Sequence, residues 1–154
     1  TGATRPAPPT SEVLMSLVSF NPFAIFVATV VAFGLGALWY GVLFSDAWLR
    51  LNGHAGKSPA ELEQLQADAP KAYAVSFLCY AIMASSLAVL ADYIVLETVP
   101  QAVKLALLIF GGFVGPLGLV ANFYSDRPIG AWLLDGAYQL VYLLMMSIIV
   151  VLWL

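Results

Sequence analysis

Asp135 is the side chain of this sequence best placed to do chemistry, because it is an ionisable group inside the long apolar run 129–154. A carboxylate within a membrane-spanning helix is costly, and it indicates a functional group unless a partner compensates its charge. Tyr138 and Gln139 follow it at i+3 and i+4, so a helix would place them on the same face. Groups at a similar depth stand in three other apolar runs, which gives the candidate cluster Asp135, Tyr138, Gln139, Asn122, Ser76, Trp39 and Tyr40.

Three roles remain open for Asp135. The interpretation we favour is a structural clamp, in which the carboxylate pairs with Arg127 or Arg50 and the aromatic residues form an interfacial belt. Helical rise places Asp135 about 9 Å from Ile129, near the edge of the membrane and not at its midplane. The alternatives are a binding site and a proton-relay or catalytic acid.

The scarcity of histidine and cysteine excludes most classes of catalytic site. The single histidine, His54, stands in a loop, and the single cysteine, Cys79, stands inside an apolar run. One chain therefore has no histidine- or thiolate-based metal site and no internal disulfide. Without a histidine on a span, no hydrolase triad can be assembled. We expect no cofactor, no metal and no enzymatic activity.

The composition is that of an integral membrane protein. Of 154 residues, 62% are hydrophobic and 10% are charged, whereas soluble domains carry about a quarter charged residues. The six lysines and arginines are scattered and the net charge is −3, so no basic face for nucleic acid is expected. The expected surroundings are the lipid bilayer.

Four apolar segments predict an all-α polytopic fold, because lipid requires every backbone polar group to be hydrogen-bonded within the chain. They run over residues 22–44, 72–95, 100–124 and 129–154. Asn21 is suited to cap the first, with Pro22 at its first helical position. We expect an antiparallel four-helix transmembrane domain over residues 21–154, preceded by a flexible tail, residues 1–20, with one interfacial turn.

The loop over residues 45–71 should carry two short helices. Asp46 is suited to cap the first, which Gly53 would end. Ser58 and Glu61 have the spacing of a capping box and predict the second.

Lysine and arginine positions predict the orientation. Four stand in the first and third loops and two on the opposite side: Arg50, Lys57, Lys71 and Arg127 against Arg5 and Lys104. This bias places those two loops in the cytoplasm and both termini outside it.

Small residues mark two candidate packing faces. The third segment carries Gly111, Gly115, Gly118 and Pro116, and the first carries Ala28, Ala32 and Gly36. Small residues four apart let helix backbones approach closely. Proline should also kink the third helix and free a carbonyl one turn earlier. Close packing is the favoured interpretation, and a discontinuous helix lining a substrate path is the alternative.

Two pairs of short matches suggest two repeated hairpins. The first helix ends in Phe44-Ser45-Asp46 and the third in Tyr124-Ser125-Asp126. The second begins with Lys71-Ala72-Tyr73 and the fourth with Gly130-Ala131-Trp132. Such hairpins would be related by an axis along the membrane normal.

Several motifs together resemble the small bacterial membrane proteins of domain-of-unknown-function family 1761. They are Gly36-Ala37-Leu38-Trp39-Tyr40-Gly41 with Trp48, Lys71-Ala72-Tyr73 with Ser76-Phe77, Asn122-Phe123-Tyr124 with Arg127-Pro128, and Asp135-Gly136-Ala137-Tyr138-Gln139. The resemblance implies a four-helix fold in the bacterial cytoplasmic (inner) membrane and implies no activity. The family often has histidine where this chain has Gln139, so a titrating role at that position is absent here.

The sequence favours a non-enzymatic membrane subunit, an accessory component that packs with copies of itself or with other subunits of a membrane complex. The alternative is a small-solute transporter or channel, formed by an oligomer, with Asp135 and Asn122 lining the site. An intramembrane enzyme ranks last, because no nucleophile–base pair is visible.

Overall fold

A computed structural model describes residues 21–153 except residue 68. The described elements are all helical: α2 (Pro22–Leu38), η1 (Trp39–Leu43), α3 (Ser45–Leu51), α4 (Pro59–Ala67), α5 (Ala69–Tyr93), α6 (Val99–Ile109), η2 (Phe110–Val114), α7 (Gly115–Tyr124) and α8 (Ile129–Leu152). The candidate spans are Pro22–Leu43, Ala69–Tyr93, Val99–Tyr124 and Ile129–Leu152, each long and apolar enough to cross a membrane. The predicted four-span, all-α architecture is therefore confirmed. The predicted N-terminal tail and turn lie outside the described residues, and the hairpin repeat stays a prediction.

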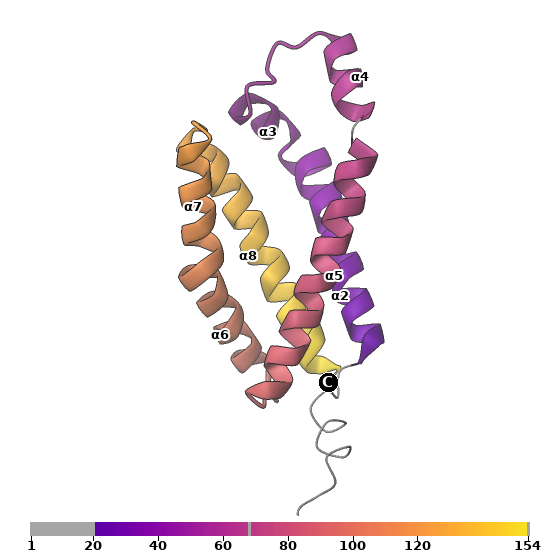
Figure 1. The fold of residues 1–154 in the computed structure, drawn as a ribbon, viewed down its shortest axis with the longest axis vertical. Coiled ribbons are helices and arrows are strands. Elements are labelled where there is room, and N and C mark those ends of the chain that lie inside the picture. The colour runs from indigo at the N-terminus through magenta and orange to yellow at the C-terminus, as the bar shows by residue number, and fades with distance from the viewer. Residues whose placement is uncertain (1–20, 68, 154) are drawn as a thin grey trace, which may run out of the picture.

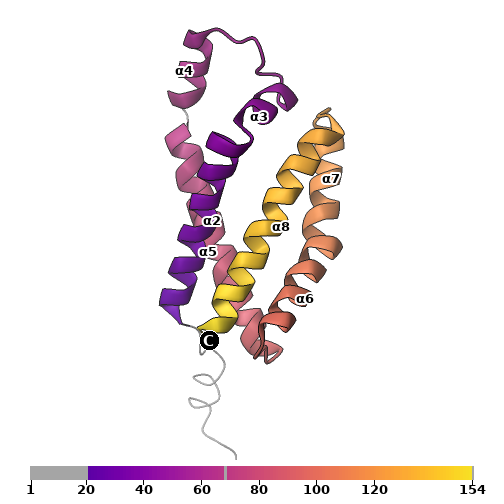
Figure 2. The same cartoon turned by 180° about the vertical axis from the view of Figure 1, so that it is seen from behind.

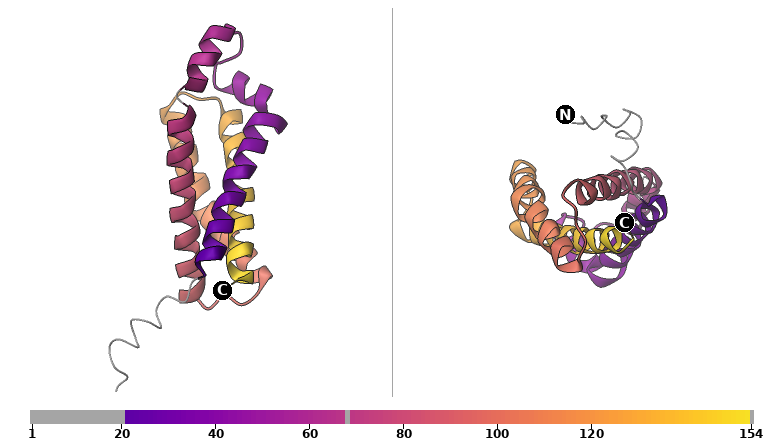
Figure 3. Two further views of the ribbon diagram at one scale, coloured as in Figure 1. Left: turned by 90° about the vertical axis from the view of Figure 1, so that its right-hand side faces the viewer. Right: turned by 90° about the horizontal axis from the view of Figure 1, so that it is seen from below.

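Helix α8 is the centre of the bundle (Figure 1). It packs against α2 and α5 on one side and against α6, η2 and α7 on the other. The same arrangement is visible from behind (Figure 2) and along the bundle from below (Figure 3). Helices α2 and α5 also pack against each other, whereas the main neighbour of the third span in the described chain is α8.

The core combines small residues with larger side chains of α8. The buried alanines are Ala24, Ala28, Ala32, Ala84, Ala88, Ala91, Ala102, Ala106 and Ala131. Alanine at these contacts lets neighbouring backbones approach closely. From α8, Leu143, Met146 and Val150 fill the space between the helices and are almost fully buried.

The second and third spans begin earlier than the apolar pattern predicts. Helix α5 starts at Ala69, so Pro70 lies in its first turn, where a missing N–H breaks no helical hydrogen bond. Helix α6 starts at Val99, where the side chain of Gln101 accepts a hydrogen bond from the backbone N–H of Thr98 (3.0 Å). At α6 the polar cap sets the boundary more closely than hydrophobicity does.

Two spans contain a widened π-helical turn. In η1 the backbone N–H of Phe44 donates to the carbonyl of Trp39 (2.9 Å), five residues earlier. In η2 the N–H of Gly115 donates to the carbonyl of Phe110, immediately before Pro116. The expected proline kink is thus accommodated by a wider turn. Such turns are frequent at functional positions, and η1 carries Tyr40.

The first loop contains both predicted short helices. Asp46 lies in the first turn of α3 and does not cap it, because the helix begins directly after η1 with Phe44 at the cap position. In front of α4, Ser58 donates from its backbone N–H and its hydroxyl to Glu61 (2.8 Å each). These hydrogen bonds hold the pKa of the Glu61 carboxyl below its usual value. Helices α3 and α4 and the α7–α8 turn lie at one end of the bundle (Figure 1).

Candidate binding site

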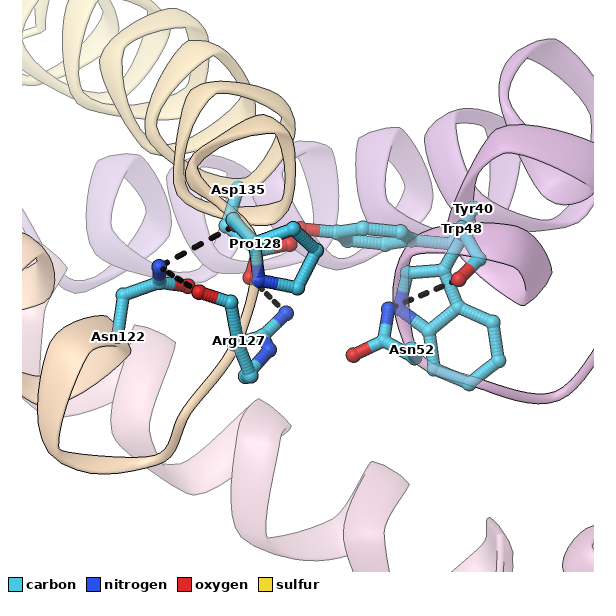
Figure 4. Close-up of polar contacts among 7 residues, drawn as sticks. All are labelled: Tyr40, Trp48, Asn52, Asn122, Arg127, Pro128 and Asp135. Carbon is cyan, nitrogen blue, oxygen red and sulfur yellow. Dashed lines mark hydrogen bonds and ion pairs between the residues drawn. The ribbon is translucent and has the colours of Figure 1, made fainter.

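Asp135 joins three parts of the chain at one end of the bundle (Figure 4). One carboxylate oxygen accepts a hydrogen bond from the Tyr40 hydroxyl of η1 (2.9 Å). The other accepts from Arg127 in the α7–α8 turn, with an N–O distance of 2.8 Å. The Arg127 and Asp135 side chains are 33% and 23% exposed, so the ion pair is partly shielded from solvent. Arg127 is therefore the arginine that pairs with Asp135. Arg50 lies on α3 and lines a separate depression.

Asn122 holds the turn that presents Arg127. Its side-chain amide donates to the carbonyls of Arg127 (2.9 Å) and Pro128 (3.3 Å). Its own backbone carbonyl accepts from the Arg127 N–H (3.1 Å). Asp126 completes the turn in the left-handed region, at φ 51°, which aspartate tolerates better than most residues. Asn122 is only 4% exposed, so these bonds are shielded from water.

A cavity of about 180 Å³ lies between α7 and α8 beside this ion pair. We call it the α7–α8 cavity; its lining residues are Gly118, Ala121, Asn122, Ser125, Arg127, Trp132, Asp135 and Gln139. The indole N–H of Trp132 donates to the carbonyl of Gly115 (3.1 Å) and fixes that ring as one wall. A Cβ added to Gly118 would lie 3.6 Å from Trp132 and 3.8 Å from the Gln139 oxygen. The missing side chain at Gly118 therefore leaves space between the two helices.

Two buried polar atoms of residues lining the cavity have no hydrogen-bond partner among the described residues: Asn122 Oδ1 and Arg127 Nε. The first is an acceptor and the second a donor. Buried polar groups are normally paired, because leaving one unpaired costs about 1–3 kcal/mol. Both atoms have almost no accessible surface, so they lie behind the wall of the cavity and are not exposed to it.

Tyr138 lies on another side of α8 from this cavity. Its hydroxyl is 3.0 Å from the carbonyl of Ala32 and 2.8 Å from the hydroxyl of Tyr80. Because the carbonyl can only accept, Tyr138 donates to Ala32 and Tyr80 donates to Tyr138. Gly36 makes this approach possible, since a Cβ there would lie 2.7 Å from the Tyr138 oxygen. The i+3 and i+4 neighbours of Asp135 therefore serve different sites.

The aromatic residues near Tyr138 pack inside the bundle. The ring of Tyr138 lies 5.1 Å from that of Tyr40 and 5.0 Å from that of Tyr142, between centroids. Tyr80 lies 5.3 Å from Tyr142, and Trp39 lies 6.1 Å from Tyr138. Trp39 and Tyr40 thus pack on Tyr138 and are half-buried. Their role in an interfacial belt stays a prediction.

One predicted residue lies outside the Asp135 contacts, and four residues near the site were not predicted. Ser76 of α5 is half-buried, and among the described residues it is not one of the side chains that hydrogen-bond to Asp135, which are Tyr40 and Arg127. Sequence reasoning missed Trp132 and Ser125 in the cavity and Tyr80 and Tyr142 in the aromatic cluster. Helical spacing carried a usable signal for two of them, because Trp132 is three residues before Asp135 and Tyr142 is four after Tyr138.

The glycines of the third span do not share one packing face within the chain. A Cβ at Gly115 would lie 3.0 Å from the Phe110 carbonyl of its own span. At Gly111 and Gly112 an added Cβ would meet no described atom within 4 Å. Gly115 is buried and its carbonyl accepts from Trp132 of α8, and Gly118 also faces α8. Gly111 lies on the other side of the widened turn, so its packing role stays a prediction. Ala28 and Ala32 of the first span are fully buried.

Among the described residues, no three histidine, cysteine, aspartate or glutamate side chains gather closely enough to hold a metal ion. A family model described as "Protein of unknown function (DUF1761)" matches residues 23–151. No curated protein and no solved structure matches the chain.

Proposed function

The chain belongs to the DUF1761 family of proteins of unknown function, and we propose that it is a non-enzymatic membrane subunit that assembles with further membrane helices. The observation that carries this proposal is the exposure of the third span. Only 11% of its most apolar window is buried, compared with 44% of the corresponding window of α8. Further helices, from copies of the chain or from other subunits of a larger complex, would cover this surface.

The exposed face of η2 is suited to such a contact. Gly111 and Gly112 are exposed and have open space at the Cβ position. In lipid, helices associate through close van der Waals packing, which glycine permits because its backbone is uncovered. Phe113 and Leu117, 69% and 73% exposed, supply large apolar surfaces on the same span.

The same proposal includes a location. We place the chain in the bacterial cytoplasmic membrane, with α3, α4 and the α7–α8 turn in the cytoplasm. Arg50, Lys57, Lys71 and Arg127 support this orientation, because positively charged residues are retained on the cytoplasmic side.

Photo-crosslinking in native membranes tests the assembly. A thiol-attached photo-crosslinker would be placed at Gly111→Cys in a Cys79→Ala background. The native Cys79 is a matched control, because it is exposed near the middle of α5. We expect efficient crosslinking to another chain from position 111 and little from Cys79. If the crosslinker captured only lipid, and did so equally at both positions, the proposal would be contradicted.

Solute transport is a second candidate, favoured by the polar α7–α8 cavity. The cavity is lined only by residues of α7, α8 and the turn between them, so a path across the membrane would need a second copy. Solute flux into proteoliposomes that is lost on Asn122 substitution would support this candidate. Flux indistinguishable from that of protein-free liposomes would contradict it.

A further inference from the structure

We propose that the partner of the third span is a helix of a different membrane subunit, which donates a hydrogen bond from a polar side chain to the backbone carbonyls of Gly111 and Gly112. This inference rests on the assembly proposed above and adds the chemistry of the partner. It follows from the widened turn η2, which leaves the two carbonyls without a helical donor.

The widened turn and the proline after it together remove these donors. In an α-helix each carbonyl accepts from the N–H four residues later. For Gly111 that donor is Gly115, whose N–H donates to the carbonyl of Phe110 instead. For Gly112 it is Pro116, which has no N–H. The proline also stands five residues after Gly111, so a wider turn cannot supply the missing bond to that carbonyl.

The rest of the described chain supplies no substitute donor. Serine and threonine hydroxyls can satisfy freed carbonyls in membrane helices, but the span Val99–Tyr124 contains neither residue. The indole N–H that α8 directs to this span, that of Trp132, donates to the carbonyl of Gly115 (3.1 Å). A Cβ added at Gly111 or Gly112 would meet no described atom within 4 Å, so this side of both residues is open.

Lipid cannot supply the donor either. Both glycines are exposed, and because glycine has no side chain, their exposed surface is backbone surface. They lie at the centre of the candidate span Val99–Tyr124, next to Phe113, which is 69% exposed. The hydrocarbon core has no water to hydrogen-bond a carbonyl, and an unpaired carbonyl there is costly. The site therefore needs a donor from another helix.

We expect this donor from a different subunit, because the chain itself offers no free strong one. Away from the ends of the described spans, the exposed side-chain donors are the Ser86 hydroxyl and the Cys79 thiol, both on α5. The hydroxyl already donates to the carbonyl of Ile82 (2.8 Å), and a thiol is a weak donor. An asparagine, glutamine, serine or threonine in the partner helix would pair with the two carbonyls.

Association with two matched synthetic peptides tests the donor requirement. Each peptide is a leucine-based transmembrane helix, with asparagine at the centre of one and leucine at the centre of the other. Energy transfer between the labelled full chain and each dilute peptide in lipid vesicles measures the affinity. We expect the asparagine peptide to bind about three- to tenfold more tightly, as hydrogen bonds between membrane helices allow. Equal affinity of the two peptides overturns the proposal.

Two proline variants assign this preference to the freed carbonyls. Pro116→Ala restores the missing N–H, so the advantage of the asparagine peptide should shrink to within about twofold. Pro100→Ala is the matched control and should keep the advantage, because this proline lies in the first turn of α6, where its missing N–H breaks no helical hydrogen bond. An advantage that survives in Pro116→Ala, or that is lost in Pro100→Ala, overturns the proposal.

Carbonyl NMR shifts read the same atoms in the unaltered chain and need no variant. The sequence contains one Gly-Gly pair and one Gly-Phe pair, Gly111-Gly112 and Gly112-Phe113. Isotope labelling of the carbonyl and of the amide that follows it therefore resolves each carbonyl in micelles. We expect at least one of the two to move downfield when the asparagine peptide is added, and neither to move with the leucine peptide. No movement with the asparagine peptide overturns the proposal.

The photo-crosslinker at Gly111→Cys in native membranes separates this inference from the assembly. A crosslink to a subunit whose contacting helix carries a polar donor supports the choice of partner. A crosslink to a second copy of the chain overturns that choice and leaves the assembly standing. Capture of lipid alone contradicts the assembly itself, and this inference with it.

Discussion

Replacing Asp135 by asparagine should destabilise the chain, because the carboxylate is shared by two partners. The variant keeps an oxygen that can accept from the Tyr40 hydroxyl, now 2.9 Å from the carboxylate. It removes the negative charge that Arg127 meets at 2.8 Å. The guanidinium group then stays in place, held by the turn that Asn122 fixes, without a compensating charge.

The exposure of the pair sets the size of the effect. Removing one partner of a fully buried ion pair costs about 3–5 kcal/mol, and exposed pairs contribute about 0–1 kcal/mol. At 33% and 23% exposure the Arg127–Asp135 pair lies between these limits. We expect Asp135→Asn to lower the free energy of unfolding by about 1.5–3 kcal/mol, the range for a hydrogen bond to a charged group. Adding Arg127→Gln should restore about half of the loss, because the unpaired charge is then gone.

Unfolding in mixed micelles with increasing SDS, followed by tryptophan fluorescence, measures these differences. Asp126→Asn is the control, since it makes the same chemical change at an exposed position whose left-handed backbone also suits asparagine. It should stay within about 0.5 kcal/mol of the unaltered chain. An Asp135→Asn protein as stable as this control would refute the clamp and assign Asp135 to binding or proton transfer. A double variant whose losses simply add would refute the direct coupling.

Three further predictions follow from the fold. In a cysteine-free background, a cysteine at Ser58 should be protected from an impermeant thiol reagent in intact cells, and one at Gln101 should be labelled; the reverse pattern would invert the orientation. Gly115→Leu should lower the free energy of unfolding by about 1–3 kcal/mol, because the new side chain overpacks against the Phe110 carbonyl. An unchanged melting temperature in detergent would contradict this, because the backbone would then accommodate the side chain without cost. Tyr138→Phe should cost about 0.5–1.5 kcal/mol for each hydrogen bond lost in the same SDS titration, whereas a neutral effect would place its hydroxyl outside the network.

Features that depend on short stretches of sequence were predictable. An apolar run without charges identifies each span, since lipid leaves the backbone no other arrangement. The Ser58–Glu61 capping box likewise depends on residues three apart, and its hydrogen bonds are present. Helical rise also placed Asp135 at the depth of Asn122, and both residues line the same cavity.

Features that depend on the order of helices around α8 were not predictable. Tyr138 and Gln139 share a helical face with Asp135, yet they contact different helices. Tyr138 hydrogen-bonds to α2 and α5, whereas Gln139 lines the cavity beside α7. No local pattern states which neighbour lies on which side. The choice of Arg127 over Arg50 has the same origin, because it depends on how the α7–α8 turn folds back on Asn122. The widened turn of η2 also moved Gly111 away from the face of Gly115.

The central claim is that the exposed third span assembles with further membrane helices. Native mass spectrometry tests this claim most directly, with the full chain released from its own membranes and lipid still attached. We predict a mass of at least two chains, or of one chain with another membrane subunit, and a return to single chains when Gly112 is replaced by leucine. That substitution fills the open face without touching another described atom at its Cβ. A single chain carrying only lipid, before and after the substitution, would contradict the account.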